Sequence, residues 1–344
     1  MTDDRTNGAP APGDGHGARR PAVVLANLGT PSAPTPSHVR RFLREFLSDR
    51  RVVETHPLLW RPVLEGVVLR VRPRVVAKKY AGIWTPQGSP LMRYTLRQAE
   101  LLGRRMPDVD VQAAMRYGEP GLGAVLDALH ARGTRRVAVL PAYPQYSATT
   151  VASLNDVAAQ WLRRNRDGFD LRLVRSFPTA PAYIDALASA LESHWGRCGR
   201  PDFAAGDAVV VSFHSIPEAM DRAGDPYRLE CMGTVAALEA RLGLARGALT
   251  VAFQSVFGPA AWLGPATIDT VTRLGARGCA RLDVICPGFM ADCLETLEEI
   301  DQLNREAFTR AGGSGFHYVP WGNDSEGAVS ALAEQARTAV AGWV

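Results

Sequence analysis

Two ten-residue stretches of the chain align with each other without a gap. Residues 22–31 read AVVLANLGTP, and residues 208–217 read AVVVSFHSIP. Each stretch begins with small and β-branched residues and ends in a proline, a pattern that predicts a buried strand followed by a turn. Where the strand ends, the first copy has Leu28 and the second has His214. The repeat therefore predicts two similar structural units, each beginning with the same strand.

The rest of the chain alternates short apolar runs with helical patterns. Runs that are apolar along their whole length are typical of parallel strands covered by helices on both faces. The expected strands are 22–27, 110–115, 136–140, 171–175, 208–213, 249–253 and 282–286. The expected helices are 94–105, 121–132, 152–165, 181–196, 228–242, 266–276 and 293–311. We therefore predict an α/β fold with two similar doubly wound, Rossmann-like lobes, parallel sheets and a cleft between them.

A looser repeat lies deeper in each unit. Residues 126–147 and 270–292 both read as a helix, a glycine, a strand and a proline, although the spacing differs by one residue. Gly133 and Gly278 suit the C-terminal ends of these helices, where a left-handed residue is common. Chance similarity between two strand-and-helix units is the alternative explanation, but the two repeats together favour a duplicated architecture.

The length of the chain, 344 residues, suits about two domains. We expect an N-terminal lobe over residues 21–185 and a C-terminal lobe over residues 186–344. Residues 1–20 are polar and rich in glycine, alanine and proline, so we expect a disordered tail there.

The composition argues against several classes of protein. The net charge is +4, but the arginines are spread along the chain and no basic block is long enough to predict a nucleic-acid partner. The five cysteines, an odd and sparsely spaced set, argue against a disulfide framework. The chain shows no signal-peptide pattern and no apolar run of about 18 residues, so we expect a cytoplasmic protein without membrane spans.

His214 is the first candidate for chemistry. Because it ends an apolar strand, we expect its ring at the mouth of a cleft, where an imidazole can accept a proton or bind a metal ion. The alternative is a histidine that is satisfied by backbone hydrogen bonds and has no further role.

An acidic helix is expected after the last strong strand. Asp292 is placed to cap this helix, with Glu295 at the capping-box position three residues on. Glu295 and Glu299 fall one turn apart on one face. Two interpretations stay open: an acidic face that points into the cleft forms a path for cations, whereas one that points outward is a solvated surface.

Residues 56–71, HPLLWRPVLEGVVLRV, form a strongly apolar run. A buried helix is one interpretation; the other is an exposed apolar lip that takes an oily ligand and touches a membrane surface.

The loops after the strands hold aromatic, arginine and hydroxyl side chains, as in AMRYGEP (114–120), AYPQYSATT (142–150) and FQSVFGPAAWLGP (253–265). Such side chains, gathered in one place, suit a flat, largely apolar ligand with acidic substituents.

Together these stretches resemble the ferrochelatases, which insert ferrous iron into a porphyrin. The resemblance runs from about residue 21 to the C-terminus. The motifs that carry it are NLGTP (27–31), FLREFLSDRRVV (42–53), GSPL (88–91), MRYGEP (115–120), YPQYSATT (143–150), SFHSIP (212–217), GDPY (224–227), FQSVFGPAAWLGP (253–265) and PGFMADCLETLEEI (287–300). Many independent motifs in the same order make the resemblance specific.

The resemblance implies two α/β lobes with the porphyrin held between them, and it implies roles for single residues. The metal-site histidine of the family falls on His214 and its active-site glutamate on Glu295, so these two are the expected catalytic and metal-binding residues. Further acidic residues of the family fall on Asp292 and Glu299, which we expect to line a path for protons or metal. Family members often have a histidine where this chain has Cys293, which leaves that cysteine without an assigned role.

The resemblance also implies a substrate pocket that distorts the macrocycle. Leu28 would face the metal centre across the macrocycle, and Arg72, Tyr80 and Ser89 would lie near the propionates. The remaining expected substrate-binding residues are Arg116, Tyr117, Gln254, Ser255, Trp262 and Phe289.

The activity that we expect is insertion of Fe²⁺ into protoporphyrin IX, which gives protohaem and releases two protons, the terminal step of haem biosynthesis. The alternatives are a chelatase that acts on coproporphyrin III or another tetrapyrrole, and a non-catalytic carrier of porphyrin or haem.

Beyond substrate Fe²⁺ we expect no cofactor. Some ferrochelatases hold a [2Fe–2S] cluster near the C-terminus, which needs about four cysteines at one place, and no cysteine follows Cys293 here. Besides porphyrin and ferrous iron, the expected partner is a membrane surface that residues 56–71 touch peripherally; no pattern in the sequence sets an oligomeric state.

Overall fold

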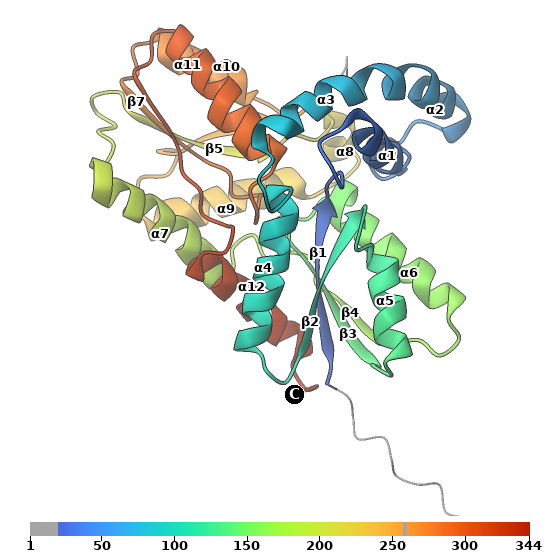
Figure 1. The fold of residues 1–344 in the computed structure, drawn as a ribbon. Helices are drawn as coiled ribbons and strands as arrows, with labels where there is room; N and C mark the ends of the chain where they lie inside the picture. The colour runs from blue at the N-terminus through green and yellow to red at the C-terminus, as the bar shows by residue number, and fades with distance from the viewer. Residues whose placement is uncertain (1–19, 257–259) are drawn as a thin grey trace, which may run out of the picture.

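Two four-stranded parallel sheets organise the molecule (Figure 1). The computed structural model describes residues 20–256 and 260–344, so all but the last residue of the predicted tail lies outside the described part. The strands of the first sheet, in the order β2-β1-β3-β4, are β1 (Ala22–Gly29), β2 (Asp110–Tyr117), β3 (Arg136–Pro141) and β4 (Asp170–Leu173). The strands of the second, in the order β6-β5-β7-β8, are β5 (Ala208–His214), β6 (Thr250–Gln254), β7 (Arg281–Ile285) and β8 (Gly315–Tyr318).

The predicted α/β fold with two similar lobes is confirmed. Each sheet places its first strand between its second and third, which is the doubly wound order of flavodoxin-like folds. The equivalence extends to loops: the Met115 N–H donates to the Pro120 carbonyl, and the Phe253 N–H donates to the Pro265 carbonyl. All seven predicted strands are present, and β8 was not predicted.

The helices fall mostly where their periodicity predicts. The predicted ones are α4 (Pro90–Arg105), α5 (Leu122–Ala131), η2 with α6 (Ala148–Ala152, Ser153–Arg164), α7 (Pro181–Cys198), α9 (Tyr227–Arg241), α10 (Thr267–Ala276) and η3 with α11 (Glu295–Asn304, Arg305–Arg310). Gly133 and Gly278 follow α5 and α10 with φ of 83° and 78°, the left-handed conformation expected there. Helices α2 (Pro57–Val63) and η1 (Leu64–Val68) lie within residues 56–71, for which a helix was one of two interpretations. The helices not predicted are α1 (Pro36–Leu47), α3 (Leu69–Ile83), α8 (Glu218–Arg222) and α12 (Glu326–Val340).

Both sheets are buried against one shared apolar layer that contains α4, α7 and α12. In β1, Val23 and Leu25 face this layer, whereas Val24 and Ala26 face a separate core with α5 and α6. In β5, Val209 faces the shared layer in the same way. Because successive side chains of a strand point to opposite faces, the continuous apolar runs of the sequence are what a sheet buried on both sides requires.

The C-terminal segment crosses from the second sheet to the first. The Arg172 guanidinium in β4 donates to the carbonyls of Ala339 and Ala341, at 2.7 and 2.8 Å, and stacks 3.9 Å from the centre of the Trp343 ring. The Trp343 indole N–H donates to the Asp170 carboxylate at 2.9 Å. The end of the chain is therefore held by the N-terminal sheet, although we assigned it to the C-terminal lobe.

The boundary that we predicted between residues 185 and 186 falls inside α7, which packs on α12. A helix in the shared layer is not a linker between lobes. Whether residues 21–185 and 186–344 fold as separate units stays a prediction.

Residues 56–71 are helical but not buried as a whole. Leu58 and Leu59 of α2 are 77% and 70% exposed, and Val63, Val67 and Val71 also face solvent. The buried-helix interpretation is therefore wrong for the outer face of this segment, whereas contact of the exposed face with an oily ligand or a membrane stays a prediction. In the described part of the chain, no helix is both long and apolar enough to span a bilayer.

We predict that Trp343→Ala lowers the free energy of unfolding by about 3 kcal/mol, because it removes a nearly buried indole and its contacts with Arg172 and Asp170. Urea unfolding followed by far-UV circular dichroism measures the change. Val344→Ala, at the neighbouring residue that is 66% exposed, is the control and should shift stability by less than about 0.5 kcal/mol. Equal stability of the two variants would contradict the docking role of Trp343.

Candidate active site

The candidate site lies at the carboxyl ends of β1 and β3 and of β5 and β7. In doubly wound sheets, ligands bind outside the carboxyl ends of the strands, where the strand order reverses. The reversal occurs between β1 and β3 in the first sheet and between β5 and β7 in the second. Leu28 and His214 occupy equivalent positions at these two places, and each is partly exposed.

His214 has one ring nitrogen fixed by the backbone. Its Nδ1 lies 2.6 Å from the carbonyl oxygen of Ser215. A carbonyl only accepts, so Nδ1 carries the proton and the lone pair of the neutral ring lies on Nε2. This arrangement prepares Nε2 to take a proton or bind a metal ion.

Glu295 and Glu299 lie on η3, a π-helical segment. Widened helices of this kind are rare and frequently occur at functional sites. The amide and hydroxyl of Ser255 both donate to the Glu299 carboxylate, and Ser255 adopts a φ of 67°, which residues other than glycine rarely do. The Gln254 side chain donates to the Glu295 carbonyl at 2.8 Å and thereby ties the start of η3 to β6.

Burial raises the pKa of Glu299, and the negative charge of Glu295 acts in the same direction. The hydrogen bonds from Ser255 and the proximity of His214 oppose this shift, but the pKa of Glu299 stays above its ordinary value. These interactions bring His214, Glu295 and Glu299 into one electrostatic cluster. The charge of His214 acts on Glu299, so this part of the acidic helix is not a purely solvated surface.

Asp292 does not cap the helix. The helix begins at Leu294, and Thr296 accepts a hydrogen bond from the Cys293 amide. The Asp292 carboxylate instead accepts from Thr296, from the Tyr318 hydroxyl at 2.6 Å and from Asn323 at 2.6 Å. The capping-box interpretation is therefore wrong, because three side-chain donors hold Asp292 against β8 and the loop after it. A role for Asp292 in a proton or metal path stays a prediction.

Helix α3 closes over the start of η3. Lys79 forms an ion pair with Glu298 at 2.9 Å, and Tyr80 packs with Leu294 and Leu297 in one apolar cluster. Burial raises the pKa of Tyr80, and the charge of Glu295 raises it further, so the phenol stays protonated beside that carboxylate. Arg72 is exposed on the same helix, about two turns before Tyr80.

Arg116 and Tyr117 are joined to Asp49. The Arg116 guanidinium donates to Asp49 and to the Ser153 hydroxyl, and the Tyr117 hydroxyl donates to Asp49 at 2.8 Å. Burial raises the pKa of Asp49, but the hydrogen bonds from Ser153, Arg51 and Tyr117 and the charge of Arg116 outweigh it and lower the pKa overall. Tyr117 has no exposed surface, and its ring packs edge-on against Phe42 and Phe46. Its contact with substrate stays a prediction.

The other expected residues separate by exposure. Trp262 and Phe289 are partly exposed, whereas Ser89, Gln254 and Ser255 are buried. Their contact with substrate stays a prediction. Cys293 is also buried and packs with Leu91, Met115 and Phe289, and its burial raises the pKa of its thiol.

Tyr143, in the motif YPQYSATT, was not among the predicted site residues. Its hydroxyl is buried and finds no hydrogen-bond partner among the described residues. Burial raises its pKa, and the neighbours that affect the pKa include Tyr117, Cys293, Arg116 and Glu295. Tyr143 follows the third strand, at the place where the strand order reverses. Because ligands bind at this place in doubly wound sheets, its position in the sequence could have identified it as a candidate.

We predict that Glu299→Gln stabilises the metal-free protein above pH 4.5, and that this gain in stability grows as the pH rises toward neutral. A raised pKa means that the folded state prefers the protonated carboxyl, so ionisation costs stability as the pH rises, and glutamine removes that cost. Thermal unfolding with a chelator present, at pH 4 and pH 7.5, measures the effect. Glu306→Gln, at an exposed carboxylate on α11, is the control. A variant as stable as the parent at pH 7.5 would contradict the prediction.

Comparisons with known proteins agree with this geometry. The family model described as Ferrochelatase matches residues 20–340. The chain is 49% identical over 340 residues to the ferrochelatase of Methylibium petroleiphilum, covering 97% of this chain and 92% of the relative, and 47% identical to that of Azoarcus sp. strain BH72, covering 96% and 90%. Among solved structures, SirB from Bacillus subtilis with Fe³⁺ shares the fold, with a TM-score of 0.53 at 12% identity over 94% of this chain and 96% of that one. The chain belongs to the ferrochelatase family.

Proposed function

We propose that the chain inserts Fe²⁺ into protoporphyrin IX and releases two protons. The observation that carries the proposal is the cluster at the end of β5, where the lone pair of His214 lies on Nε2 and two carboxylates of η3 stand nearby. Metal insertion needs a base that accepts the pyrrole protons. It also needs ligands that replace the water molecules around Fe²⁺, and this cluster supplies both kinds of group. The relatives named above are ferrochelatases, which supports the same reaction.

His214 and Glu295 divide the roles of base and metal ligand in this proposal. The neutral imidazole accepts a proton or binds Fe²⁺ through Nε2, and the Glu295 carboxylate opposes it with a negative charge. The raised pKa of Glu299 makes its carboxylate a better proton acceptor. In this proposal Glu299 passes protons outward or metal inward. The iron is substrate, and the proposal includes no resident cofactor and no [2Fe–2S] cluster.

The macrocycle lies between Leu28 and His214 in the proposed complex. Partly exposed apolar surface is present at Leu28, Trp262 and Phe289. Packing of the macrocycle against this surface releases free energy that can offset the cost of distorting the ring. In a distorted ring, a pyrrole nitrogen lone pair can point at the metal. The exposed cation of Arg72 suits a propionate.

We predict that His214→Ala lowers turnover by at least 100-fold while porphyrin still binds, because the packing surfaces remain and the base or ligand is lost. The measurement is iron-dependent loss of porphyrin fluorescence with catalytic enzyme, together with fluorescence titration of porphyrin binding. His130→Gln, at the opposite end of the first sheet, is the control and keeps the parent rate. Near-normal turnover of His214→Ala would refute the role of His214.

The same assay separates the alternatives. A porphyrin carrier would show no iron-dependent turnover with either the parent or the control. A comparison of protoporphyrin IX with coproporphyrin III decides the substrate, and the apolar lip of α2 and η1 favours the oilier protoporphyrin. Faster turnover of coproporphyrin III would reassign the substrate but leave the chemistry of the site intact.

We also propose that the protein acts in the cytoplasm and touches a membrane peripherally through α2, η1 and α3. The exposed side chains Leu58, Leu59, Val63, Val67 and Val71 form an apolar face. The exposed basic residues on these helices are Arg61, Arg70, Arg72, Arg74 and Lys78. Apolar side chains flanked by cations suit the surface of an anionic bilayer.

We predict that the double substitution Leu58→Asp and Leu59→Asp reduces binding to anionic liposomes at least tenfold, because it places two charges where apolar side chains would enter the interface. Co-sedimentation with vesicles that contain phosphatidylglycerol measures the bound fraction. Leu229→Asp is the matched control, since Leu229 is 69% exposed on α9. Equal binding by both variants would exclude this surface.

A further inference from the structure

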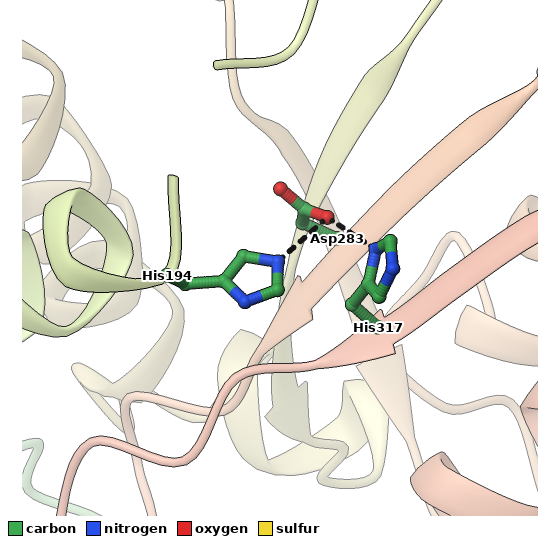
Figure 2. A group of neighbouring side chains, drawn as sticks. All are labelled: His194, Asp283 and His317. Carbon is green, nitrogen blue, oxygen red and sulfur yellow. Dashed lines mark hydrogen bonds and ion pairs between the residues drawn. The ribbon is translucent and has the colours of Figure 1, made fainter. Parts of the chain in front are cut away.

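A second group of metal-ligating side chains lies away from the candidate active site. Asp283 of β7 and His317 of β8 are direct neighbours across the two strands, and His194 reaches them from the end of α7. Figure 2 shows the Asp283 carboxylate between the two imidazole rings. Asp283 pairs with Val209, five residues before His214 along β5, so the group lies about 16 Å along the sheet from His214.

One oxygen of Asp283 faces both rings. His317 Nδ1 lies 2.9 Å and His194 Nε2 lies 3.3 Å from Asp283 Oδ1, and the three ligand atoms lie within 4.8 Å of one another. Ligand atoms about 2.0–2.1 Å from a tetrahedral Zn²⁺ are themselves about 3.3 Å apart. The distances from Asp283 Oδ1 to the two imidazole nitrogens are therefore close to the edges of a tetrahedral metal site.

The second oxygen of the carboxylate is held in place. Trp195 Nε1 and Arg281 Nη2 donate to Asp283 Oδ2, at 2.8 and 2.9 Å. Hydrogen bonds of this kind orient a metal-binding carboxylate from behind. Arg281 Nε also donates to Oδ1, at 3.1 Å, so this guanidinium fixes both oxygens of the carboxylate.

The surroundings of His194 also suit a metal ion. Its Nε2 lies 3.3 Å from both Asp283 Oδ1 and Cys198 Sγ. Imidazole nitrogen, carboxylate oxygen and cysteine sulfur are the usual ligands of Zn²⁺, so this nitrogen lies among groups of the right chemistry. Neutral imidazole is the form that binds metal ions.

The group is also accessible. Asp283 is fully buried and fixes the site from within, whereas the side chain of His317 is 38% exposed and gives a path from solvent. From these contacts we propose that His194, Asp283 and His317 bind a divalent transition-metal ion, with Zn²⁺ as the best-suited ion, at a site separate from iron insertion. The bound ion ties the end of α7 to β7 and β8.

The test must remove metal binding at the reaction site first. The reference protein is the His214→Ala, Glu295→Gln double variant without a polyhistidine tag, and equilibrium dialysis against Zn²⁺ measures the bound zinc. We expect about one Zn²⁺ per chain for the reference. Adding His317→Ala weakens binding at least tenfold, and so does adding His317→Gln, which keeps a polar side chain on β8.

Controls separate this site from other histidines and from misfolding. His130→Ala, added to the same reference, leaves zinc binding unchanged, since His130 pairs with Asp167 elsewhere in the first sheet. Zn²⁺ raises the thermal midpoint of the reference by at least about 2 °C and does not raise that of the His317 variants. Absence of bound zinc in the reference, or binding that survives both His317 substitutions in proteins with parent-like circular dichroism, overturns the proposal.

Discussion

The shared apolar layer between the two sheets is the constraint on which the rest of the structure depends. Each sheet turns one face toward α4, α7 and α12 and the other toward its own helices. Burial of apolar surface is the main stabilising contribution to such a fold. Because both sheets bury one face in the same layer, this burial also fixes the position of one sheet relative to the other. Because both sheets have the same strand order, the layer also fixes the two points where that order reverses, and the candidate site depends on these points.

Two equivalent strand ends carry different side chains, and the proposed chemistry of the site depends on this difference. The first presents Leu28 and the second presents His214, in the same register relative to their neighbours. Around His214 the protein keeps a strained Ser255, a π-helical segment and a carboxyl group whose pKa is raised by burial. Each of these features costs stability locally, and such costs are typical of functional sites held by a well-packed scaffold.

The sequence predicted strands better than it predicted contacts between distant segments. Continuous apolar runs identified seven strands, but β8, GFHY, is four residues long and broken by His317, so it has no such signal. The proline-interrupted helices α2 and α3 contain Pro62 and Pro73, which obscured their helical periodicity.

For the site, the strand ends and the family resemblance led to the prediction of His214 and Glu295, and their roles stay predictions. The docking of α12 on the first sheet and the bonding of Asp292 to Tyr318 and Asn323 could not be predicted, since they depend on packing between segments far apart in the chain.

The crossing of the C-terminal segment has a mechanical consequence. A hinge motion that opened the two sheets would have to expose the shared apolar layer and break the contacts of Arg172 and Trp343. The two sheets therefore behave as one rigid frame. Room for a macrocycle to enter and leave therefore has to come from the border of the frame, where the segment that carries α1, α2 and α3 lies (Figure 1). The contacts that join this segment to the rest of the chain include the ion pairs Arg51–Asp156 and Lys79–Glu298 and the packing of Tyr80 against Leu294 and Leu297. This apolar cluster is smaller than the shared layer, so moving the segment costs less free energy than separating the two sheets.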